Sequence, residues 1–295
     1  MEKNNYTSDI NNEISQLSKQ EVALYITATP IGNLEDITIR ALNLLKNVEF
    51  IACEDTRVTG KLLARYGINA KMICYNDFSS ERDREKVLSI VANGKSVALV
   101  SDAGTPLISD PGYKLVREAT MRNIKVIPLP GATSVLAALV LSAMPTNRFL
   151  FEGFLPPKKA GRIKALNDLK HIKATIIFFE TARRIANSLE DVLEVMGDRE
   201  AAVVREITKR FEEAKRGKIS ELLDFYKNDN TKGEIVVVLS PPVENEDSDF
   251  DLDTEIEKAL KSMSVKDAAA FLSDKTGINK KEIYGKVLEA ASKRK

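Results

Sequence analysis

The sequence predicts two α/β domains followed by a small helical appendage, and three observations lead to this fold class. The chain has 295 residues, which at about 150 residues per domain corresponds to roughly two domains. Short apolar runs alternate with longer amphipathic ones through the first half, an order typical of a parallel sheet covered by helices. Near the C-terminus an acidic stretch gives way to a basic one. We therefore expect a flexible tail at 1–20 and two α/β domains at 21–131 and 132–241. An acidic linker at 242–260 and a basic helical domain at 261–295 should follow.

The first domain is expected to contain five strands in a largely parallel sheet, because five short apolar runs stand at 23–28, 48–53, 72–75, 96–100 and 126–129. The amphipathic segments between them predict four helices. Three are expected over 36–45, 80–93 and 113–123, and the other follows the strand at 48–53 and ends at Tyr66. Asp36 can cap the first helix. Gly67 and Gly94 supply the left-handed residue that ends the second and the third.

The second domain shows fewer regular strand–helix–strand units, so we expect an α/β or α+β arrangement. A helix is predicted over 134–143, and the strand candidates are 149–152, 175–179, 201–205 and 234–239. Further helices are predicted over 164–169, 183–196 and 219–226. The pattern stops at Pro241 and Pro242.

The C-terminal region carries a charge asymmetry that the near-neutral total conceals. No Lys or Arg occurs over 244–257, whereas 261–295 holds nine basic and four acidic residues. Two helices at 265–272 and 280–288 flank a turn at 276–279, which is the outline of a helix-turn-helix. Two interpretations stay open: a surface that binds nucleic acid, and a helical hairpin whose lysines are only solvated.

Composition excludes several classes of protein. With a formal charge of +1 and 43% hydrophobic residues, the chain is neither disordered nor globally basic. Its longest apolar stretch, 132–144, is too short to span a bilayer, and the N-terminus does not resemble a secretory signal, so we expect a cytoplasmic protein without a membrane partner. One histidine and two cysteines, expected to be buried free thiols, leave too few ligands for a zinc or iron site. No metal is expected.

Loops after the predicted strands are the places to look for a site, because ligands collect at the carboxyl ends of parallel strands. Four of these loops are rich in Gly, Pro, acids and hydroxyls, at 29–36, 54–57, 101–112 and 130–134. Each alone could be an ordinary turn, but their recurrence favours one common site. The chain lacks both the dinucleotide fingerprint and the phosphate loop. A cofactor without phosphate, such as S-adenosylmethionine, therefore fits better.

These loops resemble those of the ribosomal RNA small subunit methyltransferase I family, within the tetrapyrrole methylases. The resemblance is carried by 28–36, 54–57, 101–106, 129–132, 151–156, 205–209 and 233–234, in order from about Leu24 to Leu239. It implies two α/β domains of the tetrapyrrole-methylase type with S-adenosylmethionine in the cleft between them, and a homodimer. It also implies 2'-O-methylation of a cytidine in the decoding region of 16S rRNA, with 16S rRNA or the 30S subunit as partner.

Carried over by position, the resemblance implies cofactor contacts at Pro30, Val100, Ser101, Asp102, Leu107, Thr133, Ser134, Phe179, Glu180 and Ile207. Many family members carry histidines where this chain has 75–80, so a histidine base is not expected here. A ribose hydroxyl is a weak acid and needs a base. Glu54 and Asp55 are the candidates, Asp55 as proton acceptor or orienter and Arg57 as a contact to phosphate or ribose. The alternative is an internal salt bridge that only fixes the loop.

Two other functions compete with RNA methylation. The same fold class methylates carbon atoms of tetrapyrroles, although the loop at 29–34 and the basic C-terminal region favour RNA. A nucleic-acid-binding protein whose α/β body only senses a ligand is the second rival. Such a regulator does not need shaped loops at so many strand ends.

Overall fold

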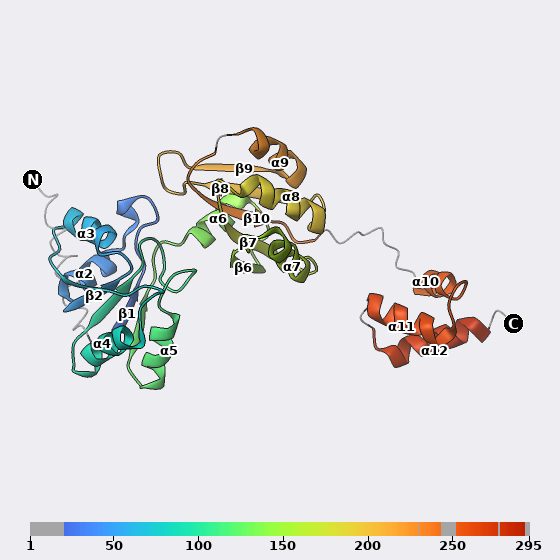
Figure 1. Cartoon of the computed structure of the whole chain (residues 1–295), viewed down its shortest axis with the longest axis horizontal. Helices are drawn as coiled ribbons and strands as arrows, with labels where there is room; N and C mark the ends of the chain where they lie inside the picture. Colours follow the sequence, from blue (N-terminus) through green and yellow to red (C-terminus); the bar gives the residue numbers. More distant parts are fainter. Residues whose placement is uncertain (1–20, 230, 243–251, 277, 293–295) are drawn as a thin grey trace, which may run out of the picture. The chain divides into compact units, whose positions relative to one another are not determined.

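The computed structural model describes residues 21–229, 231–242, 252–276 and 278–292, and the chain divides into two compact units, Met1–Pro242 and Val243–Lys295. Figure 1 shows the elements of both units. The tail expected over 1–20 and most of the acidic stretch, 243–251, lie outside the described residues. No helix in the described part of the chain is long and apolar enough to cross a membrane.

The first half of the larger unit is built on a parallel sheet whose strand order is β3-β2-β4-β1-β5. The strands expected from the sequence are all present, as β1 (Leu24–Thr27), β2 (Phe50–Cys53), β3 (Lys71–Cys74), β4 (Val97–Val100) and β5 (Val126–Leu129). The helices between them are α2 (Ile39–Asn47), α3 (Thr56–Arg65), α4 (Glu81–Ala92) and α5 (Tyr113–Met121). The expectation of a parallel α/β domain is confirmed.

Alternation of side chains explains why helices cover both faces of this sheet. Ala98 and Val100 of β4 pack with Leu45 of α2 and Leu63 of α3. Val97 and Leu99 point to the opposite face, where α4 and α5 pack. One helix start differs from the prediction. Asp36 ends a short 3₁₀ turn (Leu34–Asp36) instead of capping a helix, and α2 begins three residues later, where Thr38 Oγ1 accepts from the amide of Ala41.

The strand order places a crevice between β1 and β4. These strands are neighbours, but the loop after β1 leads to α2 on one face of the sheet and the loop after β4 leads to α5 on the other, so the two connections leave on opposite faces. Such a switch point is where open α/β sheets bind ligands. Here the two loops are joined by a pair of main-chain hydrogen bonds, from Thr29 N to Gly104 O at 2.8 Å and from Gly104 N to Thr29 O at 3.0 Å.

The second half is built on a mixed sheet of order β6-β7-β10-β8-β9, in which only β6 and β7 run parallel. Its strands are β6 (Phe149–Phe154), β7 (Thr175–Thr181), β8 (Glu200–Arg205), β9 (Glu213–Lys218) and β10 (Glu234–Leu239). Helix α6 (Ser134–Ser142) packs on one face, and α7 (Lys159–Leu169), α8 (Ile185–Met196) and α9 (Ile219–Asn228) pack on the other. Strand β9 is not expected from the sequence, because its residues are mostly charged or small.

The smaller unit contains α10 (Leu252–Ala259), α11 (Val265–Thr276) and α12 (Lys280–Ser292). Ile256, Leu272, Ile283 and Val287 are among the residues of its own apolar core. Helix α10 lies inside the stretch expected to be a linker. Ile256 and Ala259 are one turn apart in this acidic segment, and both are buried in that core.

Candidate active site

A pocket of about 270 Å³ lies between the two halves of the larger unit, near the lower end of the range of roughly 300–1,000 Å³ typical of ligand sites. Its lining from the first half comes from the loops after β1 and β4, at the crevice predicted by the strand order. The second half contributes α6 and the ends of β6, β7 and β10. The lining residues are Ile31, Ala103, Ser109, Asp110, Ser134, Phe154, Phe179, Glu180, Thr181, Ile207, Gly233, Glu234, Ile235 and Val236.

Four of the residues named from the sequence line this pocket, and others lie behind its wall. Ser134, Phe179, Glu180 and Ile207 are lining residues, whereas Pro30, Val100 and Ser101 are buried. Ser101 Oγ donates to the carbonyls of Ala103 and Gly104 at 3.3 Å, and Ser101 O accepts from Thr29 Oγ1 at 3.1 Å. These residues shape the loop instead of lining the pocket.

The remaining predicted contacts occupy the same edge of the sheet. Asp102 Oδ1 accepts from the amide of Asp55 at 3.1 Å and so ties the loop after β4 to the loop after β2. Leu107 has a φ of 76° and packs closely against Gly112. A Cβ added at Gly112 would lie only 2.9 Å from Leu107 Cδ1. Thr133 is the residue before α6 and makes no side-chain cap.

Carboxylates gather at the carboxyl edge of the first sheet. Burial, followed by the nearby charge of Asp102, raises the pKa of Glu54 above its ordinary value. Burial also raises the pKa of Asp110, against a hydrogen bond from Ser101 that lowers it. The charge of Asp77 adds to both increases. An edge with these groups attracts a positively charged ligand, because a cation relieves their mutual repulsion.

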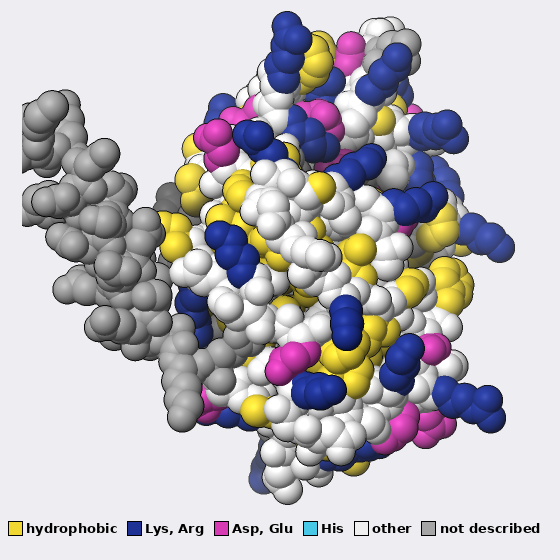
Figure 2. Space-filling model, turned by 90° about the vertical axis from the view of Figure 1, so that its left-hand side faces the viewer, with side chains coloured by type: hydrophobic (Ala, Val, Ile, Leu, Met, Phe, Trp, Pro, Cys, Tyr) yellow, Lys and Arg dark blue, Asp and Glu magenta, His cyan; other side chains and the backbone are white. Residues whose placement is uncertain are grey.

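Asp55 and Arg57 form the internal ion pair that the sequence left as an alternative. Asp55 caps α3, its Oδ1 accepting from the amide of Arg57 at 2.8 Å, and its Oδ2 lies 2.5 Å from Arg57 Nη2. The hydrogen bonds from Arg57 lower the pKa of Asp55 to about 2, which makes this carboxylate a weak base. The Arg57 side chain is 87% exposed. Basic side chains are spread over the side of the molecule that carries α2 and α3 in Figure 1 (Figure 2).

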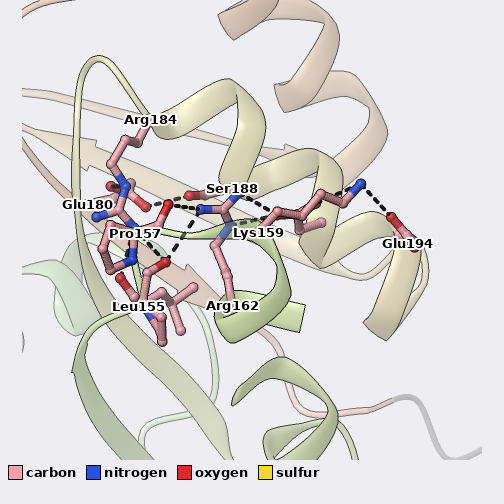
Figure 3. Close-up of polar contacts among 10 residues, drawn as sticks. Leu155, Pro157, Lys159, Arg162, Glu180, Arg184, Ser188 and Glu194 are labelled. Atoms are coloured by element: carbon pink, nitrogen blue, oxygen red, sulfur yellow. Dashed lines mark hydrogen bonds and ion pairs between the residues drawn. The ribbon is translucent and has the colours of Figure 1, made fainter. Parts of the chain in front are cut away.

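Glu180, one of the lining residues of the pocket, is held by contacts from several directions (Figure 3). Its fully buried carboxylate accepts from Ser188 Oγ at 2.5 Å and from the amide of Thr181 at 2.7 Å. Arg184 Nε lies 3.2 Å from Glu180 Oε1, and Arg184 Nη2 donates to the carbonyl of Leu155 at 2.8 Å. Because these contacts fix the end of β7 to the turn after β6, Glu180 has a structural part as well as a place in the pocket wall.

The second half adds an aromatic wall that the sequence only partly indicated. Phe154 and Phe179 meet edge to face with ring centroids 5.3 Å apart, and Phe151 meets Phe179 at 4.9 Å. Phe154 was not singled out because the strand expected over 149–152 continues to residue 154. Its apolar character at the end of a strand run was the available signal. Asp110 lies in a loop that the sequence did flag, but not as a site residue.

The two halves touch beside the pocket. The amide of Asn33 donates to Thr208 Oγ1 at 3.0 Å. A Cβ added at Gly32 would lie 2.8 Å from the carbonyl oxygen of Ile207 and 2.5 Å from Lys209 Cγ, so only glycine fits there. Thr208 itself has a φ of 63°, an unfavourable backbone angle for a β-branched residue.

Within the described ranges, no group of three or more His, Cys, Asp or Glu residues could hold a metal ion. Cys53 is buried as expected, but Cys74 is exposed, because β3 is the edge strand of the first sheet.

Comparison with known proteins gives a consistent result. Residues 23–223 match the family described as Tetrapyrrole (Corrin/Porphyrin) Methylases. The chain is 48% identical to ribosomal RNA small subunit methyltransferase I of Rickettsia prowazekii, over 90% of this chain and 95% of that protein. It is 42% identical to the protein of the same name from Escherichia coli O157:H7, over 90% and 94%.

Solved structures show the same fold at low sequence identity. A cobalt precorrin-4 methyltransferase is 19% identical with a TM-score of 0.56, covering 76% of this chain and 98% of its own. Uroporphyrin-III C-methyltransferase from Thermus thermophilus, complexed with S-adenyl homocysteine, is 18% identical with a TM-score of 0.54, over 74% and 97%. The expectation of two α/β domains of this type is confirmed.

Proposed function

This chain belongs to the tetrapyrrole (corrin/porphyrin) methylases, and from that premise we propose that it is an S-adenosylmethionine-dependent methyltransferase of small-subunit ribosomal RNA. The observation that carries the proposal is identity of 42–48% over nine-tenths of the chain to proteins named ribosomal RNA small subunit methyltransferase I. We further propose that the acceptor is the 2'-hydroxyl of a cytidine in the decoding region of 16S rRNA, presented by the RNA or by the 30S subunit.

The pocket between the two halves fits S-adenosylmethionine. When bound, this cofactor supplies a methyl group activated by a positively charged sulfonium. Asp110, together with Glu54 and Asp102 on the same edge, complements that charge, and Phe154 and Phe179 provide an apolar wall. Pro30, Val100, Ser101, Leu107 and Thr133 would act from the surrounding loops, and Ser134, Glu180 and Ile207 from the wall itself.

The acceptor hydroxyl must lose its proton, and we propose that Glu54 is the general base that accepts it. A base is effective when its pKa approaches the working pH, and general-base assistance typically contributes about 10² to 10⁴ in rate. Glu54 has a raised pKa, whereas the pKa of Asp55 is about 2. Asp55 then acts as the orienter of Arg57, whose exposed guanidinium can bind a phosphate of the RNA.

Tritiated S-adenosylmethionine tests the function directly. The protein is incubated with 30S subunits, naked 16S rRNA or uroporphyrinogen, and label is expected in an RNA substrate. Partial alkaline hydrolysis then locates a 2'-O-methyl group as a linkage that resists cleavage. Label in uroporphyrinogen alone would support carbon methylation instead, and no label in any acceptor would support the ligand-sensing alternative.

Variants of the acidic loop test the assignment of roles. We expect Glu54→Gln to lower kcat by about 10² to 10⁴. Arg57→Ala is expected to raise KM for RNA while leaving the affinity for S-adenosylmethionine unchanged. Equal losses of both affinities in Arg57→Ala would contradict a role in RNA binding, and a Glu54→Gln enzyme with wild-type kcat would contradict its role as the base.

We also propose a homodimer that works in the cytoplasm. Helix α6 packs on the second sheet through Val135 and Leu139, yet it also exposes Leu136 and Val140, the latter to 75%. A helix that is apolar on both faces is suited to a second partner, and a second copy of the chain is the partner we infer. Light scattering should give twice the chain mass for the wild type and the single-chain mass for Val140→Glu. A wild-type monomer would refute the dimer.

A further inference from the structure

We propose that Phe78 is a stacking platform for a nucleobase of the RNA substrate, next to the phosphate contact at Arg57. This inference rests on the proposed function and adds a substrate contact to it. A loop presents the aromatic ring to solvent at the edge of the sheet that holds the acidic residues, and the basic helix α3 contacts β3, the strand that precedes this loop.

Phe78 has no part in the hydrophobic core, since it is 96% exposed. A buried phenylalanine removes about 150–250 Å² of apolar surface from water, and the exposed Phe78 does not contribute this stabilisation. The turn that presents it is nevertheless well fixed. The amide of Phe78 donates to Asn76 Oδ1 at 3.0 Å, and the amide of Asn76 donates to Ser79 Oγ at 2.8 Å. Ser80 follows directly as the cap of α4, so the loop holds the ring at a defined place.

The loop lies beside the acidic site. The amide of Tyr75 donates to the carbonyl of Cys53 at 2.8 Å, and Cys74 Sγ donates to the carbonyl of Glu54 at 3.5 Å, which joins the ends of β3 and β2. Asp77, the neighbour of Phe78, is close enough for its charge to act on Glu54 and on the pocket residue Asp110. A base stacked on Phe78 would therefore lie near the acceptor ribose.

The adjacent helix favours a polyanion over an apolar partner. Helix α3 exposes Arg57, Lys61 and Arg65 at four-residue spacing, and it contains no acidic residue. Lys61 and Arg65 form no ion pair with any described residue. Figure 2 views the molecule from the side that carries α2 and α3 in Figure 1, and shows basic side chains with apolar ones between them. Cations that track a backbone and an aromatic ring that receives a base are how proteins hold single-stranded RNA.

The chain contains no tryptophan, which allows a direct optical test. Phe78→Trp introduces a single tryptophan, which can be excited apart from the seven tyrosines, and we expect its emission to be quenched by 16S rRNA and not by S-adenosylmethionine. Met121→Trp is the matched control. Met121 is 74% exposed at the end of α5, away from the carboxyl edge of the sheet, so its signal should not change beyond that of non-specific RNA binding.

Kinetics of further variants separate stacking from mere apolarity. We expect Phe78→Ala to raise KM for RNA about 5-fold to 150-fold, the range measured for loss of one stacked base, with KM for S-adenosylmethionine within twofold of wild type. Tyrosine at this position should restore binding, and leucine should not. Because the side chain is exposed, none of these variants should alter the unfolding temperature.

Several outcomes would overturn the proposal. Wild-type KM for RNA in Phe78→Ala would do so, as would full activity of Phe78→Leu. Quenching of Phe78→Trp that depends on protein concentration without RNA would assign the ring to a contact between copies. A wild-type chain that methylates no RNA would refute the proposed function, and the RNA-dependent signal of Phe78→Trp would still decide the contact.

Discussion

Asp191 and Glu190 are adjacent on α8 and allow a comparison of a buried with an exposed ion pair. The Asp191 side chain is 2% exposed and accepts from Arg162 Nε at 2.6 Å and Nη2 at 2.5 Å. Arg162 is itself 6% exposed. Glu190 is about half exposed and lies 2.9 Å from Lys227 Nζ on α9. Replacing either acid with alanine removes one carboxylate from the same helix.

The expected costs differ because of what each substitution leaves behind. Without Asp191, the buried Arg162 guanidinium keeps only the carbonyls of Pro156 and Pro157, at 3.5 and 3.3 Å. Breaking a buried pair in this way costs about 3–5 kcal/mol. Glu190→Ala leaves a lysine in water and should cost roughly 0.2–1 kcal/mol.

Urea unfolding of the full chain measures both changes. With a slope m of about 3 kcal/mol/M, Asp191→Ala should lower the midpoint by about 1–2 M and Glu190→Ala by less than about 0.4 M. Arg162 also anchors the turn that follows Phe154, so we expect weaker cofactor binding in Asp191→Ala alone. Equal midpoints for the two variants would refute the claim that burial makes Arg162 dependent on its partner.

Three other outcomes are expected. Gly32→Ala should lower the free energy of unfolding by about 1–3 kcal/mol and raise KM for S-adenosylmethionine, because the added Cβ would lie 2.8 Å from the carbonyl oxygen of the pocket residue Ile207. Thermal unfolding and cofactor titration measure these two effects, and an unchanged KM would contradict the prediction. Native protein should react with a thiol reagent at Cys74 only, since Cys53 is buried and burial raises its pKa to about 11; two fast thiols would be inconsistent with the structure. Since a base must be deprotonated, kcat/KM should fall as the pH drops through the raised pKa of Glu54, above the ordinary value of 4.5, and a profile unchanged in Glu54→Gln would argue against that residue.

The fold was largely predictable where the residues of an element carry its pattern themselves. Strands β1 and β4 are buried along their whole length and almost entirely apolar, because both faces of a parallel sheet are covered. Strand β9 has the sequence Glu-Ala-Lys-Arg-Gly-Lys and pairs only with β8 at the edge of the second sheet. An edge strand tolerates charge, so nothing local distinguishes it from a loop.

The parts of the site were likewise predictable only where a local sequence pattern marks them. The loops after β1 and β4 were recognisable because a ligand crevice belongs to the ends of parallel strands. The stretch 233–236, at the start of β10, was not predicted to line the pocket, since its position depends on an antiparallel strand order that the sequence does not reveal. Asp55 shows a different limit: its place in a loop suggested chemistry, and only its bonds to Arg57 show how weak a base it is.

The main-chain bridge between Thr29 and Gly104 has a consequence for ligand association. Two loops that would otherwise fluctuate separately are joined before any ligand arrives, so their ordering entropy is part of folding and not of binding. A ligand that enters between them meets a formed surface. Association through this side of the pocket should therefore proceed in one kinetic phase, with a rate set by encounter instead of by loop closure.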